Sequence, residues 1–215
     1  MKILIAVPTF ENITPDTFKS IWDLDKGDNE CSFNFVRGYD CATARNKIAQ
    51  LTLDGSYDYV FMIDNDVTPP KDALLNLLSH NVDVVSGFYM RRYLDDQTLN
   101  KTCVYKLKDE HNKLYFNYSK ESAYTKEELI KLYNDNKYLI KIHGGGMGCI
   151  LIKTSVFNKI SYPWFDWVNY NNSHRGILSE DLFFCEQLRK NDIPCYVDTR
   201  VGCGHLIRKI ETCKV

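Results

Sequence analysis

Residues 57–66 read Tyr-Asp-Tyr-Val-Phe-Met-Ile-Asp-Asn-Asp, a short apolar run that ends in two aspartates one residue apart. The run is bounded by turn residues and is rich in β-branched and aromatic side chains, which is typical of a buried strand. Two carboxylates directly after such a strand can offer oxygen atoms to a divalent cation that also binds a diphosphate. Taken alone, Asp64-Asn65-Asp66 is equally typical of a turn. Its interpretation therefore depends on the rest of the chain.

Strand-like and helix-like segments alternate on both sides of this stretch. Thr14-Pro15 has the chemistry of a helix start, and Asp54-Gly55 that of a helix end. The strands expected here are residues 2–7, 32–36, 57–63 and 82–88. Repeated strand–helix units predict an α/β fold with a mostly parallel, Rossmann-like central sheet flanked by helices. Ligands bind such sheets beyond the carboxyl ends of the strands, where we expect Thr9, Asp64 and Asp66.

The pattern changes between residues 91 and 141, where lysine, tyrosine, asparagine and acidic residues dominate. We expect an insertion with local order that could cover the site as a lid. Its expected elements are a hairpin of residues 104–108 and 113–118 and a helix over residues 126–133. Further strands are expected at 149–152 and 195–198, and further helices at 154–159 and 180–190. We expect one domain of residues 1–215.

Composition excludes some functional classes. The formal net charge of -1, from 27 basic and 28 acidic residues, provides no global field to recruit nucleic acid or an anionic membrane. The first apolar run stops at Pro8, too short for a signal or transmembrane segment, so we expect a soluble, cytoplasmic protein. The eight cysteines are scattered without a CxxC spacing, which favours reduced thiols and predicts no zinc site.

A second acidic motif, Ser179-Glu180-Asp181, stands where a helix is expected to begin. Acidic residues in a first turn are stabilised by the helix dipole without any catalytic role. Alternatively, Asp181 is the base that takes a proton from an attacking hydroxyl, with Glu180 binding the acceptor or supporting the loop. His205, which follows the last strand, is a candidate metal ligand. A histidine there can also be an ordinary surface residue.

Two further patterns have structural alternatives. The glycines of residues 144–148 precede a strand, whereas a dinucleotide fingerprint follows one, so a nicotinamide site is excluded. Gly145 and Gly146 let backbone approach a sugar or an acceptor, or they form a bulge. Trp164 and Trp167 are candidates for stacking on a sugar ring, although aromatic residues beside a proline more often belong to the core.

Taken in order, these motifs resemble a GT-A glycosyltransferase of the family-2 type. The resemblance covers nearly the whole chain and rests on the segments Val7-Pro8-Thr9, Ala44-Arg45-Asn46, Phe61 to Asp66, the glycine segment, Ser179 to Leu182, and Gly204-His205. It implies a nucleotide-sugar half (1–90), an insertion or lid (91–141), and an acceptor and catalytic half (142–215).

The resemblance also implies roles for individual residues. The nucleotide would be contacted by Pro8, Thr9, Glu11, Arg45, Asp64 and Asn65. Asp66 would bind Mn²⁺ or Mg²⁺, with Asp64 on the ribose or on metal-bound water and His205 as a further ligand. Asp181 would be the base of an inverting transfer of a sugar from a nucleoside diphosphate, UDP before GDP, to a glycan, lipid-linked or protein-linked acceptor.

Two features depart from the family pattern. The second strand ends in Arg37-Gly38-Tyr39-Asp40 and not in the usual acidic and serine-rich turn. We therefore expect Arg37 or Asp40 to contact the uracil or guanine base of the nucleotide. The chain also ends soon after His205, as expected of a compact viral, phage or bacterial form, or of one domain of a longer polypeptide.

Three alternatives stay open. A retaining transferase of the same fold needs no side-chain base, and a nucleotidyltransferase releases pyrophosphate. A carbohydrate-binding module would use Trp164 and Trp167 without nucleotide or metal. The identities of the sugar and the acceptor depend on a pocket that the sequence does not define.

Overall fold

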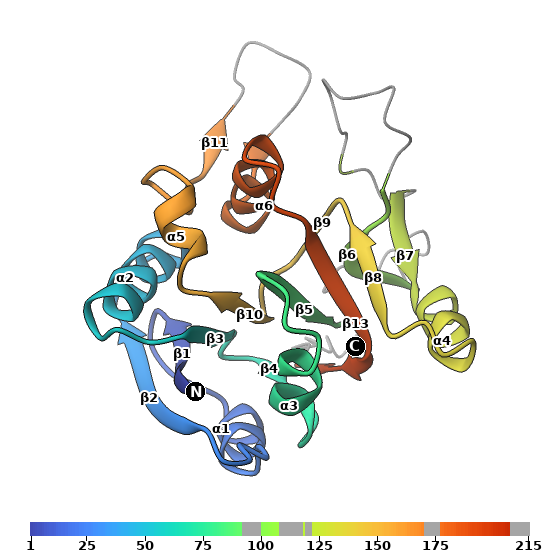
Figure 1. Cartoon of the computed structure of the whole chain (residues 1–215), viewed down its shortest axis with the longest axis horizontal. Coiled ribbons are helices and arrows are strands. Elements are labelled where there is room, and N and C mark those ends of the chain that lie inside the picture. Colours follow the sequence, from blue (N-terminus) through green and yellow to red (C-terminus); the bar gives the residue numbers. More distant parts are fainter. Residues whose placement is uncertain (92–99, 108–117, 119–121, 170–176, 207–215) are drawn as a thin grey trace, which may run out of the picture.

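A seven-stranded sheet crosses the molecule in the order β2-β1-β3-β10-β5-β13-β8 (Figure 1). The computed structural model describes residues 1–91, 100–107, 118, 122–169 and 177–206. The strands of the sheet are β1 (Lys2–Thr9), β2 (Glu30–Arg37), β3 (Tyr59–Ile63), β5 (Val84–Phe88), β8 (Leu139–Ile142), β10 (Cys149–Lys153) and β13 (Cys195–Gly202). Five of them, β2, β1, β3, β5 and β13, run in one direction. The predicted α/β class with a mostly parallel sheet is therefore confirmed.

The middle of the sheet is not parallel, which the strand–helix pattern did not predict. β10 lies between β3 and β5 and runs against both of them. Cys149, its first residue, pairs with Ile63, the last residue of β3. The glycine-rich segment before β10 thus reaches the carboxyl ends of the parallel strands, and the chain can only run back from there. β8, at one edge, also runs against its neighbour β13.

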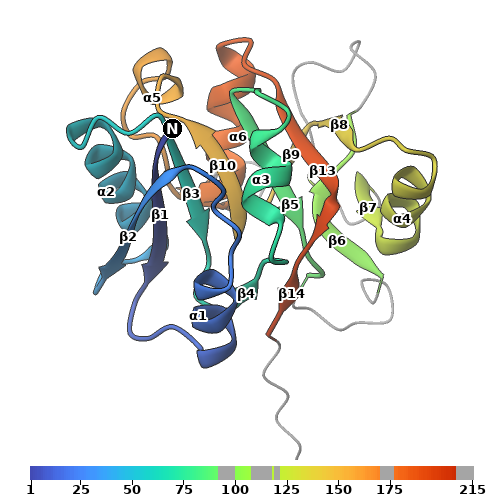
Figure 2. The same ribbon diagram turned by 60° about the horizontal axis from the view of Figure 1, so that its bottom comes forward.

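Helices cover both faces of the sheet (Figures 1 and 2). One face carries α2 (Cys41–Asp54), α5 (Val156–Lys159) and α6 (Glu180–Lys190), and the other carries α1 (Pro15–Trp22) and α3 (Ala73–Leu78). Thr14 caps α1 as predicted, because its side chain accepts a hydrogen bond from the Thr17 N–H. α2 ends at Gly55, the expected end signal.

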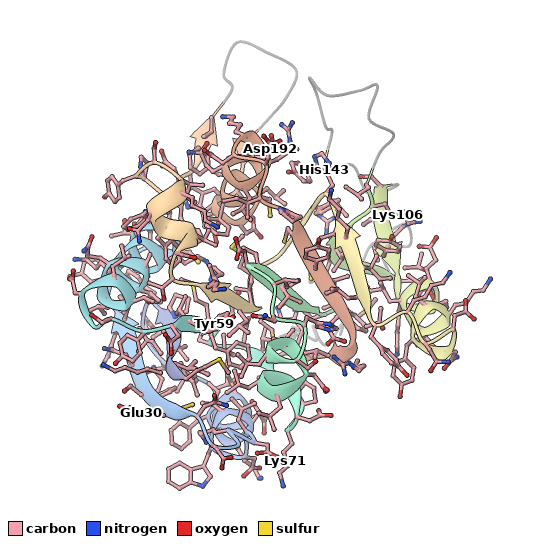
Figure 3. All side chains as sticks on the ribbon, viewed as in Figure 1. Glu30, Tyr59, Lys71, Lys106, His143 and Asp192 are labelled. Atoms are coloured by element: carbon pink, nitrogen blue, oxygen red, sulfur yellow. The ribbon has the colours of Figure 1, made fainter. Side chains whose placement is uncertain are left out.

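The core lies between these layers. All five residues of β3 are buried, and Tyr59, labelled in Figure 3, marks the start of this strand in the middle of the molecule. Apolar side chains of β1 and α2 pack on the same core. The predicted buried strand is thus confirmed at its carboxyl-terminal five residues. Within the described ranges, no helix has both the length and the apolar character needed to cross a membrane.

The insertion has local order, as expected. β6 (Lys101–Tyr105), β7 (Ala123–Thr125) and β9 (Gly144–Gly145) form a small antiparallel sheet in the order β7-β6-β9. α4 (Lys126–Asn134) follows β7 and begins with a capping box of Thr125 and Glu128. The first arm of the predicted hairpin overlaps β6, but its described partners are β7 and β9. Most of the second arm, residues 113–117, lies outside the described residues.

Two short antiparallel pairs complete the fold. β4 (Val67–Thr68) pairs with β14 (Gly204–His205), and β11 (Val168–Asn169) pairs with β12 (Ile177–Leu178). The first pair joins the segment after β3 to the segment after β13, at the lower end of Figure 2. It thereby brings Asp66 close to His205.

Candidate active site

Arg45 joins the two acidic motifs. It lies on α2 with only 1% of its surface exposed. Its Nη2 donates to Asp64 Oδ1 over 2.7 Å, and its Nε donates to Glu180 Oε1 over 3.4 Å. Nη1 donates to the backbone carbonyl of Met147, in the loop before β10. One buried guanidinium therefore holds together the end of β3, the start of α6 and the glycine-rich segment.

Around Arg45, the negative charge of the neighbouring carboxylates exceeds the single positive charge of the guanidinium. Burial raises the pKa of Asp64, and the nearby charges of Asp66 and Glu180 add to this effect, while Arg45 opposes it. Burial also raises the pKa of the Cys41 thiol, beside the same charges at the start of α2. An excess of carboxylate at the carboxyl ends of the strands is suited to a cationic or metal-bound ligand.

Asp181 lies in the first turn of α6. Its Oδ1 accepts hydrogen bonds from the Ser179 hydroxyl and, over 2.7 Å, from the Leu182 N–H. Ser179 occupies the predicted N-cap position, but its side chain bonds Asp181 and does not cap the helix. Burial and then the charge of Glu180 raise the pKa of Asp181 to about 6. A carboxyl group with this pKa can act as a base near neutral pH.

Asp66 and His205 face each other across the β4–β14 pair. His205 Nε2 lies 3.8 Å from Asp66 Oδ2, and His205 Nδ1 lies 2.7 Å from the carbonyl oxygen of Met90. A carbonyl can only accept, so Nδ1 carries a proton and Nε2 is the ring nitrogen that can bind a metal. The Leu206 N–H donates to the backbone carbonyl of Asp66, which fixes the two segments together. The structure thus brings together Asp66 and His205, two of the three residues, with Asp64, that the sequence proposed at a metal site.

Asn65 shapes the turn between the two aspartates. Its side-chain N–H groups donate to Thr9 Oγ1 over 3.2 Å and to the Asn12 carbonyl over 2.8 Å, and its own carbonyl accepts from the Thr14 N–H. The Thr9 hydroxyl donates to the same Asn12 carbonyl. Asn65 and Thr9 therefore tie the turn to the loop after β1. These hydrogen bonds account for the positions of the Asn65 and Thr9 side chains without a ligand.

The remaining nucleotide candidates lie at the margin of this cluster. Pro8 is buried within β1, and Glu11 and Arg37 are exposed after β1 and at the end of β2. Asp40 caps α2: its Oδ1 accepts from the Thr43 N–H over 3.1 Å, and hydrogen bonds from Thr43 lower its pKa. This cap accounts for Asp40 as a structural residue. Its contact with the base of a nucleotide stays a prediction.

The acceptor candidates divide into packed and exposed residues. Gly145 belongs to β9. A Cβ on Gly146 would lie 2.4 Å from the Tyr89 hydroxyl, so the missing side chain at Gly146 makes room for the Tyr89 side chain. Trp164 is buried, and its Nε1 donates to the Phe157 carbonyl. Its burial agrees with the core alternative and leaves no open ring face for a sugar. Trp167 is half exposed.

Tyr89 is the main site residue that the sequence reading missed. It follows β5 directly, is 9% exposed, and accepts the Gly148 N–H at its hydroxyl over 3.0 Å. Its ring contacts His205, and burial together with the charges of Asp64 and Asp181 raises its pKa. The sequence could have indicated Tyr89. Ligands bind beyond the carboxyl ends of the strands, which is why Asp64 was expected at the site, and Tyr89 directly follows the expected strand of residues 82–88.

Asp66 and His205 could supply two of the ligands of a cation, one oxygen and one nitrogen. Among the described residues, no group of three or more His, Cys, Asp or Glu side chains is placed to hold a metal ion. An oxygen and a nitrogen ligand suit Mn²⁺ better than Mg²⁺, which prefers oxygen. A cation here would take its other ligands from water and from the substrate.

Comparisons with known proteins identify the fold. No protein-family model matches the chain, and no curated protein matches its sequence. A solved structure described as the crystal structure of A197 from STIV matches with a TM-score of 0.61 and 21% sequence identity. The match covers 97% of this chain and 87% of that chain. At this identity the two proteins share the fold.

Proposed function

We propose that this chain is a metal-dependent glycosyltransferase with a GT-A fold that takes a sugar from a nucleoside diphosphate, UDP more readily than GDP. One observation carries the proposal: Arg45 bridges Asp64 and Glu180, so the acidic turn after β3 and the acidic start of α6 form one site. Neither motif alone indicates more than a turn or a helix start. Together they place a cation-binding side and a basic carboxylate at the same end of the sheet.

The two sides of the site have different roles in this proposal. Asp66 and His205 would hold Mn²⁺, which would supply positive charge to the diphosphate leaving group. Asp64 is fixed by Arg45 and stays beside the cation, where it binds the ribose or a water molecule. Asp66 is thus the more direct ligand, because the Oδ1 of Asp64 is already bonded to Arg45.

Asp181 is the base in this proposal. Its Oδ1 is held by Ser179 and Leu182, and in the described part of the chain its Oδ2 accepts no hydrogen bond. Oδ2 would take the proton from the acceptor hydroxyl as that oxygen attacks the anomeric carbon, and the sugar–diphosphate bond breaks on the opposite side. Glu180 is a positioning residue, because it acts through Arg45 and through its charge on Asp181.

A thermal-shift experiment tests the donor side. We expect nucleoside diphosphates to raise the melting temperature of the protein in the presence of Mn²⁺ and to have little effect without it. Asp66→Ala should abolish this Mn²⁺-dependent shift while the apo-protein melts within a few degrees of wild type. The absence of any Mn²⁺-dependent shift in the wild-type protein, with any nucleoside diphosphate, would refute the proposal.

The alternatives differ in their products. Release of pyrophosphate would identify a nucleotidyltransferase, and a product that keeps the anomeric configuration of the donor would identify a retaining enzyme. Affinity for sugars without nucleotide or metal would identify a binding module. The base proposed here requires an inverted product and a nucleoside diphosphate.

A further inference from the structure

The two edges of the large sheet differ in how they are protected. An exposed edge offers unpaired backbone groups to any other strand, and charges, prolines, bulges or a short edge strand normally block it. β8 has four residues, and its Lys141 is exposed. β2 has eight residues, with neither a charge nor a proline between Glu30 and Arg37. It pairs with β1 over its full length without a bulge.

Between the charged residues at its two ends, the exposed side chains of β2 are aromatic. Phe33 and Phe35 are 41% and 39% exposed, and their rings pack edge to face with centroids 4.5 Å apart. Figure 3 places Glu30, the first residue of β2, at the periphery of the molecule, and in Figure 1 no described element lies outside β2. The edge is therefore long, regular, apolar and uncovered by the described residues.

The backbone of β2 shows which groups point outward. The N–H groups of Glu30 and Gly38 donate to Met1 and Thr9 of the β1 side. Because the direction alternates along a strand, the even-numbered residues of β2 bond β1. The odd-numbered residues therefore point their N–H and C=O groups away from the sheet. These residues are Cys31, Phe33, Phe35 and Arg37.

We propose that a second copy of this chain pairs with β2 in an antiparallel, twofold-symmetric manner, so that the two large sheets become continuous. A twofold axis at Asn34 places Phe33 opposite the partner's Phe35, and Cys31 opposite the partner's Arg37. All four outward residues then take part in hydrogen-bonded pairs. A self-complementary patch of this kind is what a twofold interface requires.

The side chains favour this register. Both Phe33–Phe35 pairs fall on the same face of the joined sheet, which forms a cluster of four rings around the axis. Aromatic cross-strand pairs contribute about 0.2–1 kcal/mol each beyond backbone pairing. The inference does not depend on the proposed function.

Sedimentation velocity tests the association. We expect the wild-type protein to shift from monomer toward twice the monomer mass between about 1 and about 100 µM, the range of a weak dimer. Phe33→Lys with Phe35→Lys should stay monomeric over this range, because four like charges would meet at the axis. Phe35→Pro should do the same, because it removes an outward N–H and leaves the bonds to β1.

A matched control uses exposed apolar residues at the other end of the sheet. Ile130→Lys with Tyr133→Lys changes two residues of α4 of similar exposure and should dimerise like wild type. Circular dichroism and melting temperature show that each variant is folded. A wild-type protein that stays monomeric at about 100 µM, or a control that dissociates as the β2 variants do, would overturn the proposal.

Cysteine crosslinking tests the register. In the proposed dimer, Asn34 lies opposite the partner's Asn34 in a non-hydrogen-bonded pair, with Cα atoms about 4.5 Å apart, within the range of a disulfide. Under a mild copper oxidant, Asn34→Cys should give a covalent dimer whose linked peptides contain position 34 of both copies. Ser32→Cys, which lies opposite the partner's Val36, should not link to itself. Efficient self-linking of Ser32→Cys in place of Asn34→Cys would contradict the register.

Discussion

Arg45 and Arg200 both bind buried carboxylates, but the charge balance around them differs. Arg200 bonds the fully buried Asp198 through Nε and Nη2, and His80 bonds the same carboxylate over 2.7 Å. Arg200 Nη2 also bonds the Asn76 carbonyl of α3. Two basic side chains thus serve one carboxylate, and the network fastens α3 to β13.

Around Arg45 the balance is reversed. One guanidinium bonds Asp64 and Glu180 directly, and Asp66 and Asp181 add their charges nearby. The raised pKa values of Asp64 and Asp181 result first from burial and then from this excess of negative charge. A balanced network stabilises a fold, whereas an unbalanced one at the end of a sheet marks a place where a ligand supplies the missing charge. Substitutions in the two networks therefore distinguish a stabilising role from a ligand-binding one.

The largest expected effect is that of Arg45→Met. The substitution leaves the half-buried Asp64 and the buried Glu180 without their cation, and loss of one partner of a buried pair costs about 3–5 kcal/mol. We expect urea unfolding at neutral pH to show this loss, and we expect the loss to shrink as the pH falls and the carboxylates take up protons. A loss below about 1 kcal/mol would show that water, and not Arg45, solvates these carboxylates.

Asp181→Asn should reduce sugar transfer by about 10²–10⁴-fold, because it removes the proposed base. It should also stabilise the protein at pH 7 by about 1–3 kcal/mol, because an aspartate with a pKa near 6 is ionised there against the preference of the fold. The proposed transferase activity of the wild-type protein should rise with pH through about 6.

The sign of the stability effect follows from linkage. The folded-state pKa of Asp181, about 6, exceeds its ordinary value of 3.8, so the folded protein binds more protons between these two values. Its contribution to stability therefore falls as the pH rises through this window. Asp181→Asn should remove this slope, whereas the exposed Asp28→Asn should not. Near-full transfer by Asp181→Asn with donor binding intact would show that Asp181 is not the base.

Arg200→Met should have a smaller effect on stability, about 1.5–3 kcal/mol, because Asp198 keeps its bond to His80. It should leave the Mn²⁺-dependent nucleotide shift unchanged, since this network lies apart from the site. Ser79→Ala, which removes one of the groups that Arg200 Nη2 bonds, is the milder comparison. A changed nucleotide shift in Arg200→Met would show that the two networks are coupled.

Asp40→Ala should have the smallest effect. Loss of an N-cap costs about 1 kcal/mol, and Thr14→Ala at the start of α1 should cost a similar amount. Because the pKa of Asp40 is lowered, its contribution is present at neutral pH and is lost as the pH falls through the folded-state pKa. If Asp40→Ala weakened nucleotide binding without loss of stability, Asp40 would contact the base and the cap would be incidental.

Local patterns in the sequence predicted the elements and the positions of the acidic residues. β1, β3 and α1 lie where apolar spacing and capping chemistry placed them, because these signals act between residues that are close in the chain. The direction of β10 was not predicted, since a run of four apolar residues reads the same in either direction. Only its pairing with β3 and β5 decides the direction.

The sequence by itself determined that Asp64-Asn65-Asp66 ends a buried strand and that Glu180 and Asp181 start a helix. The tertiary structure decided that Arg45 joins the two motifs, that His205 turns Nε2 toward Asp66, and that Asp181 has a raised pKa. The physical reason is that secondary structure follows from neighbours in the chain. Ionisation and ligand geometry instead depend on burial and on charges a few ångströms away, which the fold brings from distant parts of the sequence.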